Sequence, residues 1–190
     1  MKIGILITSC PNHKEIVERC LKRYIGLEFP VVFGWDGDKF NDARNIPSIV
    51  YTGKKFGLQA GEKWLVHHCA KKLDELGCEY VFKACGDVEI GKPERIAELI
   101  NKLEGRDFIC QNWDGKGNYF GTKIFFGKLK SLLTVSERWK DDKTGKHIER
   151  QYAETMNDLG IKFKAMDDVD NEDEDGFWYG WLGCKHLKDG

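Results

Sequence analysis

The sequence predicts an α/β domain in which a mixed, mostly parallel sheet is flanked by helices. The chain has 190 residues, which is enough for one domain that buries most of its apolar surface. Short apolar runs rich in β-branched and aromatic residues recur along it, and segments with helical spacing lie between several of them. Because strands that alternate with helices form a parallel sheet covered on both faces, we expect residues 1–190 to form a single domain of this class.

The strands are predicted by these apolar runs, each of which is bounded by turn or charged residues. In chain order they are KIGILIT, FPVVFGW, SIVYT, EYVFKA, RDFICQN, YFGTKIFF and IKFKAM.

The helices are predicted by apolar residues three and four positions apart. They cover about residues 12–25, 58–76, 93–103 and 148–159. Asn12 is placed to cap the first helix, with Glu15 three residues later to complete a capping box. Gly77, Gly105 and Gly160 follow the other three helices, where glycine can adopt the left-handed conformation that ends a helix.

The composition excludes several classes of function. The 30 basic and 31 acidic residues nearly balance, and no Lys/Arg-rich run is present, so we do not expect a nucleic-acid partner. The 7 cysteines are an odd number without CxxC pairs, which argues against a zinc knuckle or a disulfide framework. The first residues, MKIGILITSC, are too short an apolar run for a signal peptide or a membrane span. We therefore expect a soluble, cytoplasmic protein.

The end of the chain combines an acidic segment with an aromatic one. The acidic segment, DDVDNEDED at residues 167–175, is expected to form an exposed loop because like charges disfavour a packed core. The aromatic segment that follows, GFWYGWLGCKH, predicts that the tail folds back onto the domain.

A ligand site is expected beyond the carboxyl ends of the parallel strands, where loops and helix amino termini converge. The loops that follow the first, second, third and fourth predicted strands contain TSCPN, DGDKF, GKKFG and CGDVEIGKP. Asp36 in the second loop and Asp87 in the fourth therefore lie on the same rim.

The order of these segments resembles a known family. The segments are ILITSCPN, VVFGWDGD, KKFGLQAGEKWLVHHCA and EYVFKACGDVEIGKPERIAELI, and together they are similar to the nucleotide-sugar-binding half of the GT-A glycosyltransferases. The resemblance implies a nucleotide-sugar-binding half at about residues 1–112 and an acceptor-side half with a tail at about 113–190. It also implies an enzyme that transfers a sugar from a nucleotide-diphosphate sugar, with a UDP-sugar favoured, to a hydroxyl of a glycan or another acceptor.

The same resemblance implies a divalent cation, Mn²⁺ or Mg²⁺. In the family, the fourth strand ends in an Asp-x-Asp motif that holds this cation on the diphosphate. Here Cys85, Gly86 and Asp87 occupy the motif, so Asp87 keeps the second acidic position. Glu89 and a carboxyl-terminal histidine, His186, are the other metal ligands that the resemblance implies. The alternatives are a turn or capping carboxylate for Asp87, a packing role for Cys85 and a surface position for His186.

The remaining nucleotide contacts are also implied by the resemblance. Asp36 matches the acidic residue that contacts the base or ribose, and Thr8 and Ser9 in the first loop offer contacts to the base. Lys185 and Lys188 match lysines that approach the diphosphate. The alternative for Asp36 is an Asp-Gly turn.

The acceptor-side half contributes the catalytic candidate. The segment GTKIFFGKLKSLL resembles the family's acceptor-side strand and helix, and HIERQYAETMNDLGIKF resembles the helix that carries a catalytic carboxylate in inverting members. Glu149 falls at the position of that general base. The alternative is a solvated glutamate in the first helical turn, which the helix dipole favours.

Two rival functions remain open. The first is a non-catalytic nucleotide- or glycan-binding relative, because Cys85 replaces an acid. The second is a sugar nucleotidyltransferase, although TSCPNHKE lacks the glycine-rich loop that such an enzyme uses to hold a triphosphate.

Overall fold

A seven-stranded sheet forms the centre of the computed structural model, which describes residues 1–40, 46, 48–111, 119–166, 178–179, 182 and 184–187. Across the sheet the order is β3 (Ile49–Tyr51), β2 (Val31–Trp35), β1 (Ile3–Ser9), β4 (Tyr80–Cys85), β7 (Gly121–Lys128), β6 (Phe108–Gln111) and β8 (Phe163–Ala165). Only β7 runs against the other strands of this sheet. The predicted mixed, mostly parallel sheet is confirmed.

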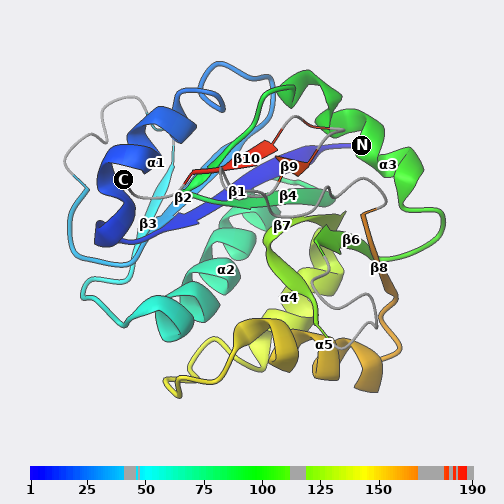
Figure 1. The fold of residues 1–190 in the computed structure, drawn as a ribbon. Helices are drawn as coiled ribbons and strands as arrows, with labels where there is room; N and C mark the ends of the chain where they lie inside the picture. Colours follow the sequence, from blue (N-terminus) through cyan, green and yellow to red (C-terminus); the bar gives the residue numbers. More distant parts are fainter. Residues whose placement is uncertain are drawn as a thin grey trace.

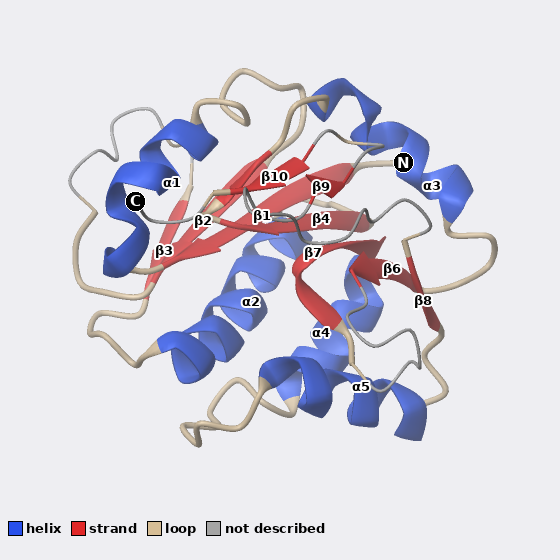
Figure 2. Ribbon diagram, viewed as in Figure 1, coloured by secondary structure: helices blue, strands red, loops and turns tan. Residues whose placement is uncertain are grey.

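Helices cover both faces of the sheet (Figures 1 and 2). One face carries a 3₁₀ turn at Pro11–His13 with α1 (Lys14–Leu21), and a second 3₁₀ turn at Pro93–Glu98 with α3 (Leu99–Lys102). The other face carries α2 (Leu58–Glu75), α4 (Leu129–Glu137) and α5 (Ile148–Asp158). Successive residues of β1 alternate between the faces, so Ile5 and Ile7 pack in the core beneath α1 while Leu6 packs in the core beneath α2.

Glycine ends three of the helical segments where the sequence predicts it. The φ angles of Gly77, Gly105 and Gly160 are 74°, 78° and 67°, which lie in the left-handed region that side chains disfavour. The segment at 93–103 differs from the prediction of one continuous helix, because its first half is a 3₁₀ turn and only its end is α-helical. Such turns are common at the amino ends of helices.

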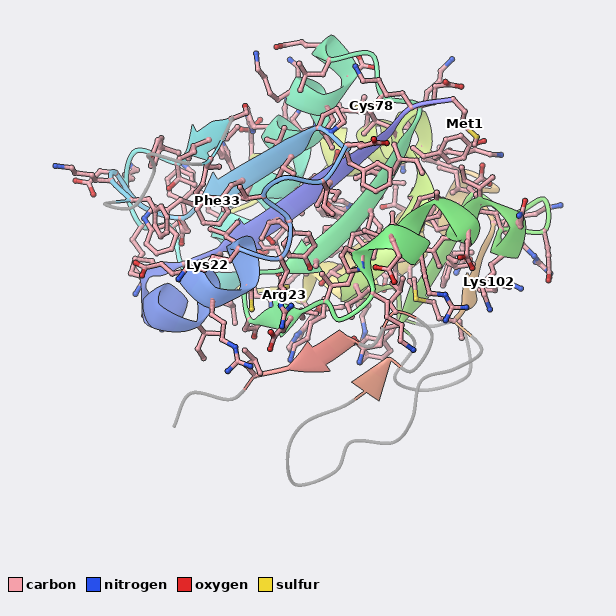
Figure 3. The ribbon with its side chains drawn as sticks, turned by 90° about the horizontal axis from the view of Figure 1, so that it is seen from above. Met1, Lys22, Arg23, Phe33, Cys78 and Lys102 are labelled. Carbon is pink, nitrogen blue, oxygen red and sulfur yellow. The ribbon has the colours of Figure 1, made fainter. Side chains whose placement is uncertain are left out.

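The end of the chain returns to the domain as part of a small second sheet. This sheet has the order β5 (Val88–Glu89), β10 (Cys184–His186) and β9 (Trp178–Tyr179). It lies between α1 and α3 (Figures 1 and 3). Leu182 is fully buried and its carbonyl accepts a hydrogen bond from Lys92 N at 2.8 Å. The expectation that the tail folds back is confirmed, whereas the acidic segment 167–175 lies outside the described residues.

The helices of the described part of the chain include none that is both long and apolar enough to cross a membrane. The boundary near residue 112 between a donor half and an acceptor half stays a prediction.

Candidate functional site

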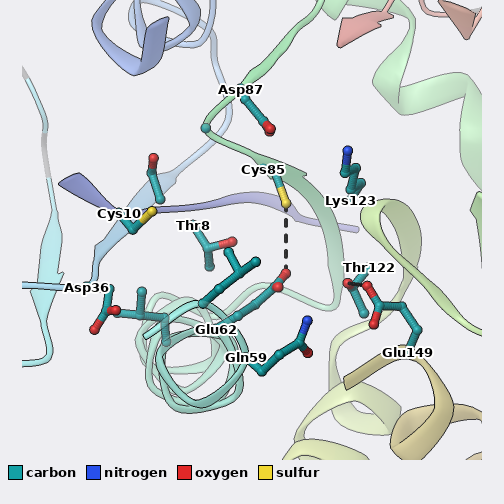
Figure 4. Close-up of a pocket in the computed structure, with 14 residues that line it drawn as sticks. Thr8, Cys10, Asp36, Gln59, Glu62, Cys85, Asp87, Thr122, Lys123 and Glu149 are labelled. Carbon is teal, nitrogen blue, oxygen red and sulfur yellow. Dashed lines mark hydrogen bonds between the residues drawn. The ribbon is translucent and has the colours of Figure 1, made fainter. Parts of the chain in front are cut away.

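A pocket of about 320 Å³ opens at the carboxyl ends of β1, β2 and β4 (Figure 4). The first turns of α2, the start of β7 and the first turn of α5 complete its wall. It is lined by Thr8, Ser9, Cys10, Asp36, Leu58, Gln59, Glu62, Leu65, Cys85, Gly86, Asp87, Thr122, Lys123 and Glu149. The structure therefore brings together five of the residues that the sequence singles out, namely Thr8, Ser9, Asp36, Asp87 and Glu149. The location is the one at which open α/β sheets bind ligands.

Asp87 is placed by a tight crossing of two chain segments. Gly86 donates a hydrogen bond from its backbone N to the carbonyl of Thr8 at 2.8 Å. A Cβ atom at Gly86 would lie 2.5 Å from Ser9 Oγ and 2.7 Å from Val17 Cγ2, so a side chain does not fit there. The glycine thus lets the turn after β4 pass directly over the end of β1, and this turn holds Asp87 at the pocket with an exposed fraction of 8%.

Glu89 is not brought into the pocket. Its Oε2 lies 2.6 Å from Arg19 Nη2 and its Oε1 lies 3.1 Å from Arg23 Nε, so both carboxylate oxygens form ion pairs with residues of α1 and the turn after it. Residues two apart in a regular strand share a face, but Asp87 belongs to the turn before β5. The turn therefore separates the two carboxylates that the sequence suggests as neighbouring ligands.

Asp36 holds the amino end of α2 against β2. Its Oδ1 accepts hydrogen bonds from Phe56 N at 2.9 Å and Thr52 Oγ1 at 3.1 Å, and its Oδ2 accepts one from Gly57 N at 3.0 Å. Its exposed fraction is 2%. These bonds satisfy backbone donors at the start of a helix, as a capping side chain does. The contact between Asp36 and a nucleotide stays a prediction.

A buried lysine lies beneath the pocket, and sequence reasoning missed it. Lys83 Nζ donates hydrogen bonds to Glu62 Oε1 at 2.6 Å, to Cys85 Sγ at 3.0 Å and to the carbonyl of Thr122. Burial alone lowers the pKa of Lys83, but the adjacent Cys85 sulfur and Glu62 carboxylate raise that pKa above its ordinary value. Lys83 is therefore a cation paired with Glu62, on the floor of the pocket.

Cys85 occupies the first position of the expected acidic motif as a neutral thiol. Burial raises the pKa of Cys85 to about 12, although the charge of Lys83 opposes this. The thiol donates toward Glu62 Oε1 at 3.8 Å, the contact drawn as a dashed line in Figure 4. A protonated thiol is a poor ligand for a hard cation such as Mg²⁺.

The sequence contains a signal for this pair. Glu62 precedes Leu65 by three positions and Val66 by four, and both of these residues are buried, so Glu62 lies beside the buried face of α2. Lys83 lies in the middle of the apolar strand YVFKAC. Opposite charges at two core positions predict a buried ion pair, because an unpaired buried charge is costly.

Glu149 faces the pocket from the first turn of α5. Its Oε1 accepts a hydrogen bond from Thr122 Oγ1 at 3.1 Å, and its Oε2 is buried without a hydrogen-bond partner in the part of the chain that the structure describes. The start of this helix is held by α2, because Ile148 N donates to Gln59 Oε1 at 2.8 Å. A buried polar atom without a partner marks a place where a ligand or water completes the structure.

The loop before α5 is also fixed to α2 by a buried lysine. Lys63 is fully buried, and its Nζ donates to Asp142 Oδ2 at 3.0 Å, to Gln151 Oε1 at 3.0 Å and to the carbonyl of Thr144 at 3.2 Å. This network holds the helix that carries Glu149 against the helix that carries Glu62.

The tail runs beside Asp87, as the sequence predicts. Leu187 N donates to the carbonyl of Asp87 at 2.8 Å, and β10 pairs Lys185 with Glu89 and His186 with Val88. The structure describes only the backbone of Lys185 and His186, and Lys188 lies outside the described residues. Their contacts with a metal or a diphosphate stay predictions.

The donor set at the pocket suits a divalent cation that arrives with a phosphate ligand. In the described part of the chain no group of three or more His, Cys, Asp or Glu side chains is arranged to hold a metal ion. Mg²⁺, however, is commonly bound by one or two carboxylates together with substrate phosphates and water. Asp87 fits that role, whereas the neutral thiol of Cys85 and the paired carboxylate of Glu89 do not.

Comparison with known proteins identifies the fold. No family model matches the chain, and no curated protein matches it either. Among solved structures, a proposed nucleotide-diphospho-sugar transferase from Desulfovibrio desulfuricans G20 is 14% identical with a TM-score of 0.58, over 87% of this chain and 80% of that one. A 4-diphosphocytidyl-2C-methyl-D-erythritol synthase from Anaerococcus prevotii DSM 20548 is 13% identical with a TM-score of 0.57, over 87% and 86% of the two chains. A cytidylyltransferase from Leptospira borgpetersenii serovar Hardjo-bovis is 17% identical with a TM-score of 0.54, over 93% and 79%. The chain therefore has the fold of the nucleotide-diphospho-sugar transferases.

Proposed function

We propose that the chain is a glycosyltransferase that transfers a sugar from a nucleotide-diphosphate sugar to an acceptor hydroxyl with the help of Mn²⁺ or Mg²⁺. The observation that carries the proposal is the pocket at the carboxyl ends of the parallel strands, in which Asp87 is the second residue after β4 and Glu149 lies on the wall formed by α5. The proposed nucleotide-diphospho-sugar transferase from Desulfovibrio desulfuricans, which shares the fold, supports the same class of donor.

The charges of the lining indicate that a cation must accompany the diphosphate. The acidic side chains in it are those of Asp36, Glu62, Asp87 and Glu149, whereas Lys123 is the basic one among the described lining residues. A diphosphate would be repelled by this excess of negative charge. A divalent cation on the diphosphate would supply the Lewis-acid chemistry that stabilises the leaving group, and Asp87 would hold it.

The side chains at the two ends of the pocket would contact different parts of the substrates. Figure 4 shows Lys123 and Asp87 at one end, with Cys85 between them, and Glu149 beside Thr122 at the other. Lys123 would bind the diphosphate, joined by Lys185 and Lys188 from the tail. His186 would join Asp87 as a ligand of the cation. Thr8 and Ser9, at the end of β1, would contact the nucleotide.

Glu149 would act as the general base. Its Oε1 is oriented by Thr122, which leaves Oε2 to accept the proton of the acceptor hydroxyl. The hydroxyl oxygen forms a bond to the anomeric carbon while the bond from that carbon to the diphosphate oxygen breaks, and the nucleoside diphosphate leaves.

A sugar nucleotidyltransferase is the second candidate, because two of the solved structures with this fold are a cytidylyltransferase and a diphosphocytidyl-methylerythritol synthase. That reaction consumes a nucleoside triphosphate and a sugar phosphate and releases pyrophosphate. The loop TSCPNHKE after β1 lacks the glycines that cradle a triphosphate, which favours glycosyl transfer.

The test is a thermal-shift panel of UDP-, GDP-, dTDP- and CDP-sugars, each with and without Mn²⁺. A ligand at one hundred times its dissociation constant stabilises the folded state by about 2.7 kcal/mol. For a chain of this length this raises Tm by about 5–11 °C. We expect the sugars of one nucleotide to raise Tm by this amount when Mn²⁺ is present, and free sugars to leave Tm unchanged. Pyrophosphate release from a nucleoside triphosphate and a sugar phosphate would instead establish the second candidate, and a panel without any shift would refute both.

A further inference from the structure

The part of the pocket between α2 and α5 contains a polar cluster of Gln59, Glu62 and Glu149. Figure 4 shows this cluster at the opposite end of the pocket from Asp87 and Lys123. Glu62 Oε1 is bound to Lys83, Gln59 Oε1 to Ile148 N, and Glu149 Oε1 to Thr122 Oγ1. Each of the three side chains thus has one oxygen anchored in the protein, and its second polar atom makes no hydrogen bond with the part of the chain that the structure describes.

Glu62 is held in place more firmly than an ordinary pocket carboxylate. The side chain of Lys83 is fully buried and that of Glu62 is 12% exposed. If Glu62 turned away, the ammonium group of Lys83 would lose its anionic partner inside the protein, which is strongly unfavourable. Cys85 and Thr122 fix the position of that ammonium group from the other sides. The carboxylate of Glu62 is therefore preorganised before any ligand binds.

The chemistry of the cluster selects what can occupy it. Carboxylate oxygens accept hydrogen bonds from hydroxyl or ammonium groups, and an amide NH₂ donates to hydroxyl oxygens. A ligand carboxylate is ionised at neutral pH and has no proton to donate to Glu62 or Glu149, so it would face two like charges. The cluster can therefore form hydrogen bonds with a polyhydroxyl sugar ring, with or without an amino group, and repels a sugar ring that carries a carboxylate.

We propose that Gln59, Glu62 and Glu149 form the sugar subsite of the donor pocket, and that Glu62 makes it select neutral or amino sugars over uronic acids. The inference rests on the proposed function, because it assigns the sugar class of the same donor.

The experiment compares UDP, UDP-glucose and UDP-glucuronate by calorimetry with Mn²⁺ present throughout. If the thermal-shift panel selects guanosine, then GDP, GDP-mannose and GDP-mannuronate replace them. In the wild type we expect UDP-glucose to bind at least about tenfold more tightly than UDP-glucuronate, a factor that like charges at close range readily produce. Glu62→Gln should improve the binding of UDP-glucuronate, so that its affinity comes to within about threefold of that of UDP-glucose. The affinity for UDP should not change. Glu75→Gln, an exposed position on the same helix, is the matched control and should keep the wild-type ratio.

A second variant separates selectivity from folding. Glu62→Gln leaves Lys83 without its anion, whereas Glu62→Gln combined with Lys83→Met removes both charges, and this double variant should show the same loss of selectivity. The sugar subsite is refuted, while the proposed function stands, if UDP binds but the wild type binds UDP-glucose and UDP-glucuronate equally well. The same holds if neither variant changes the ratio of these two affinities. If no nucleotide binds the wild type, both are refuted.

Discussion

Removal of the buried ammonium group beneath the pocket should be costly for stability. The change is Lys83→Met, which replaces a fully buried side chain with an apolar one that is shorter by the terminal nitrogen, and leaves Glu62 and the carbonyl of Thr122 without their donor. Breaking a buried ion pair by removing one partner costs about 3–5 kcal/mol. Because Glu62 lines the pocket and is 12% exposed, water can partly replace the lost donor. We therefore expect the lower end, about 3 kcal/mol, and a fall in Tm of about 6–12 °C.

The assay is urea unfolding combined with a double-mutant cycle. Adding Glu62→Gln to Lys83→Met removes the orphaned carboxylate, so the double variant should be more stable than Lys83→Met alone, with a coupling energy of about 1–3 kcal/mol. The control is Lys72→Met, which breaks an exposed ion pair with Glu75 and should change stability by less than about 0.5 kcal/mol. If Lys83→Met changes the free energy of unfolding as little as this control does, or if the double variant is no more stable than Lys83→Met, the buried ion pair does not stabilise the floor of the pocket.

His67, Asp36 and Glu149 each make contacts whose loss can be measured in a single variant. Burial lowers the pKa of His67 to about 4 although Glu137 opposes this. As the pH falls from 6.5 to 4, the imidazole of His67 is therefore protonated in the unfolded chain before it is protonated in the folded chain, which favours unfolding. The wild type should lose about 3 kcal/mol of stability over that window, and His67→Gln should flatten this slope in urea unfolding at several pH values. Asp36→Ala should lower the free energy of unfolding by about 2–4 kcal/mol and speed hydrogen exchange at Gly57 N, since it removes the acceptor for the start of α2; unchanged exchange would contradict this role. Glu149→Gln should leave the binding of UDP unchanged and reduce turnover by about 10²- to 10⁴-fold, and a full-rate variant would exclude it as the base.

The fold could be predicted because the segments carry strong local signals. Alternation of apolar runs and helical stripes, together with Gly77, Gly105 and Gly160 after three of the helical segments, locates the elements without tertiary information. The strands of the tail could not be predicted in the same way. β9 and β10 have 2 and 3 residues, too few for a periodic pattern, and β10 forms through its pairing with β5, which is distant in sequence.

The rim of the pocket was more predictable than its floor. Asp87 and Asp36 follow parallel strands, so their place at one edge of the sheet comes from topology alone. The contact of Glu62 with Lys83 depends on how α2 packs on β4, and the separation of Glu89 from Asp87 depends on a turn that a strand pattern does not reveal. These features are set by tertiary packing.

Calorimetric titration of UDP with and without Mn²⁺, in the wild type and in Asp87→Asn, measures whether Asp87 holds the cation on a nucleoside diphosphate. The substitution removes the charge and keeps the shape of the side chain. Asp74→Asn, an exposed change on α2, serves as the control. We predict that Mn²⁺ tightens the binding of UDP to the wild type and the control, and that this gain disappears in Asp87→Asn while its Tm without ligand stays close to that of the wild type. An equal gain from Mn²⁺ in all three proteins would show that Asp87 does not hold the cation.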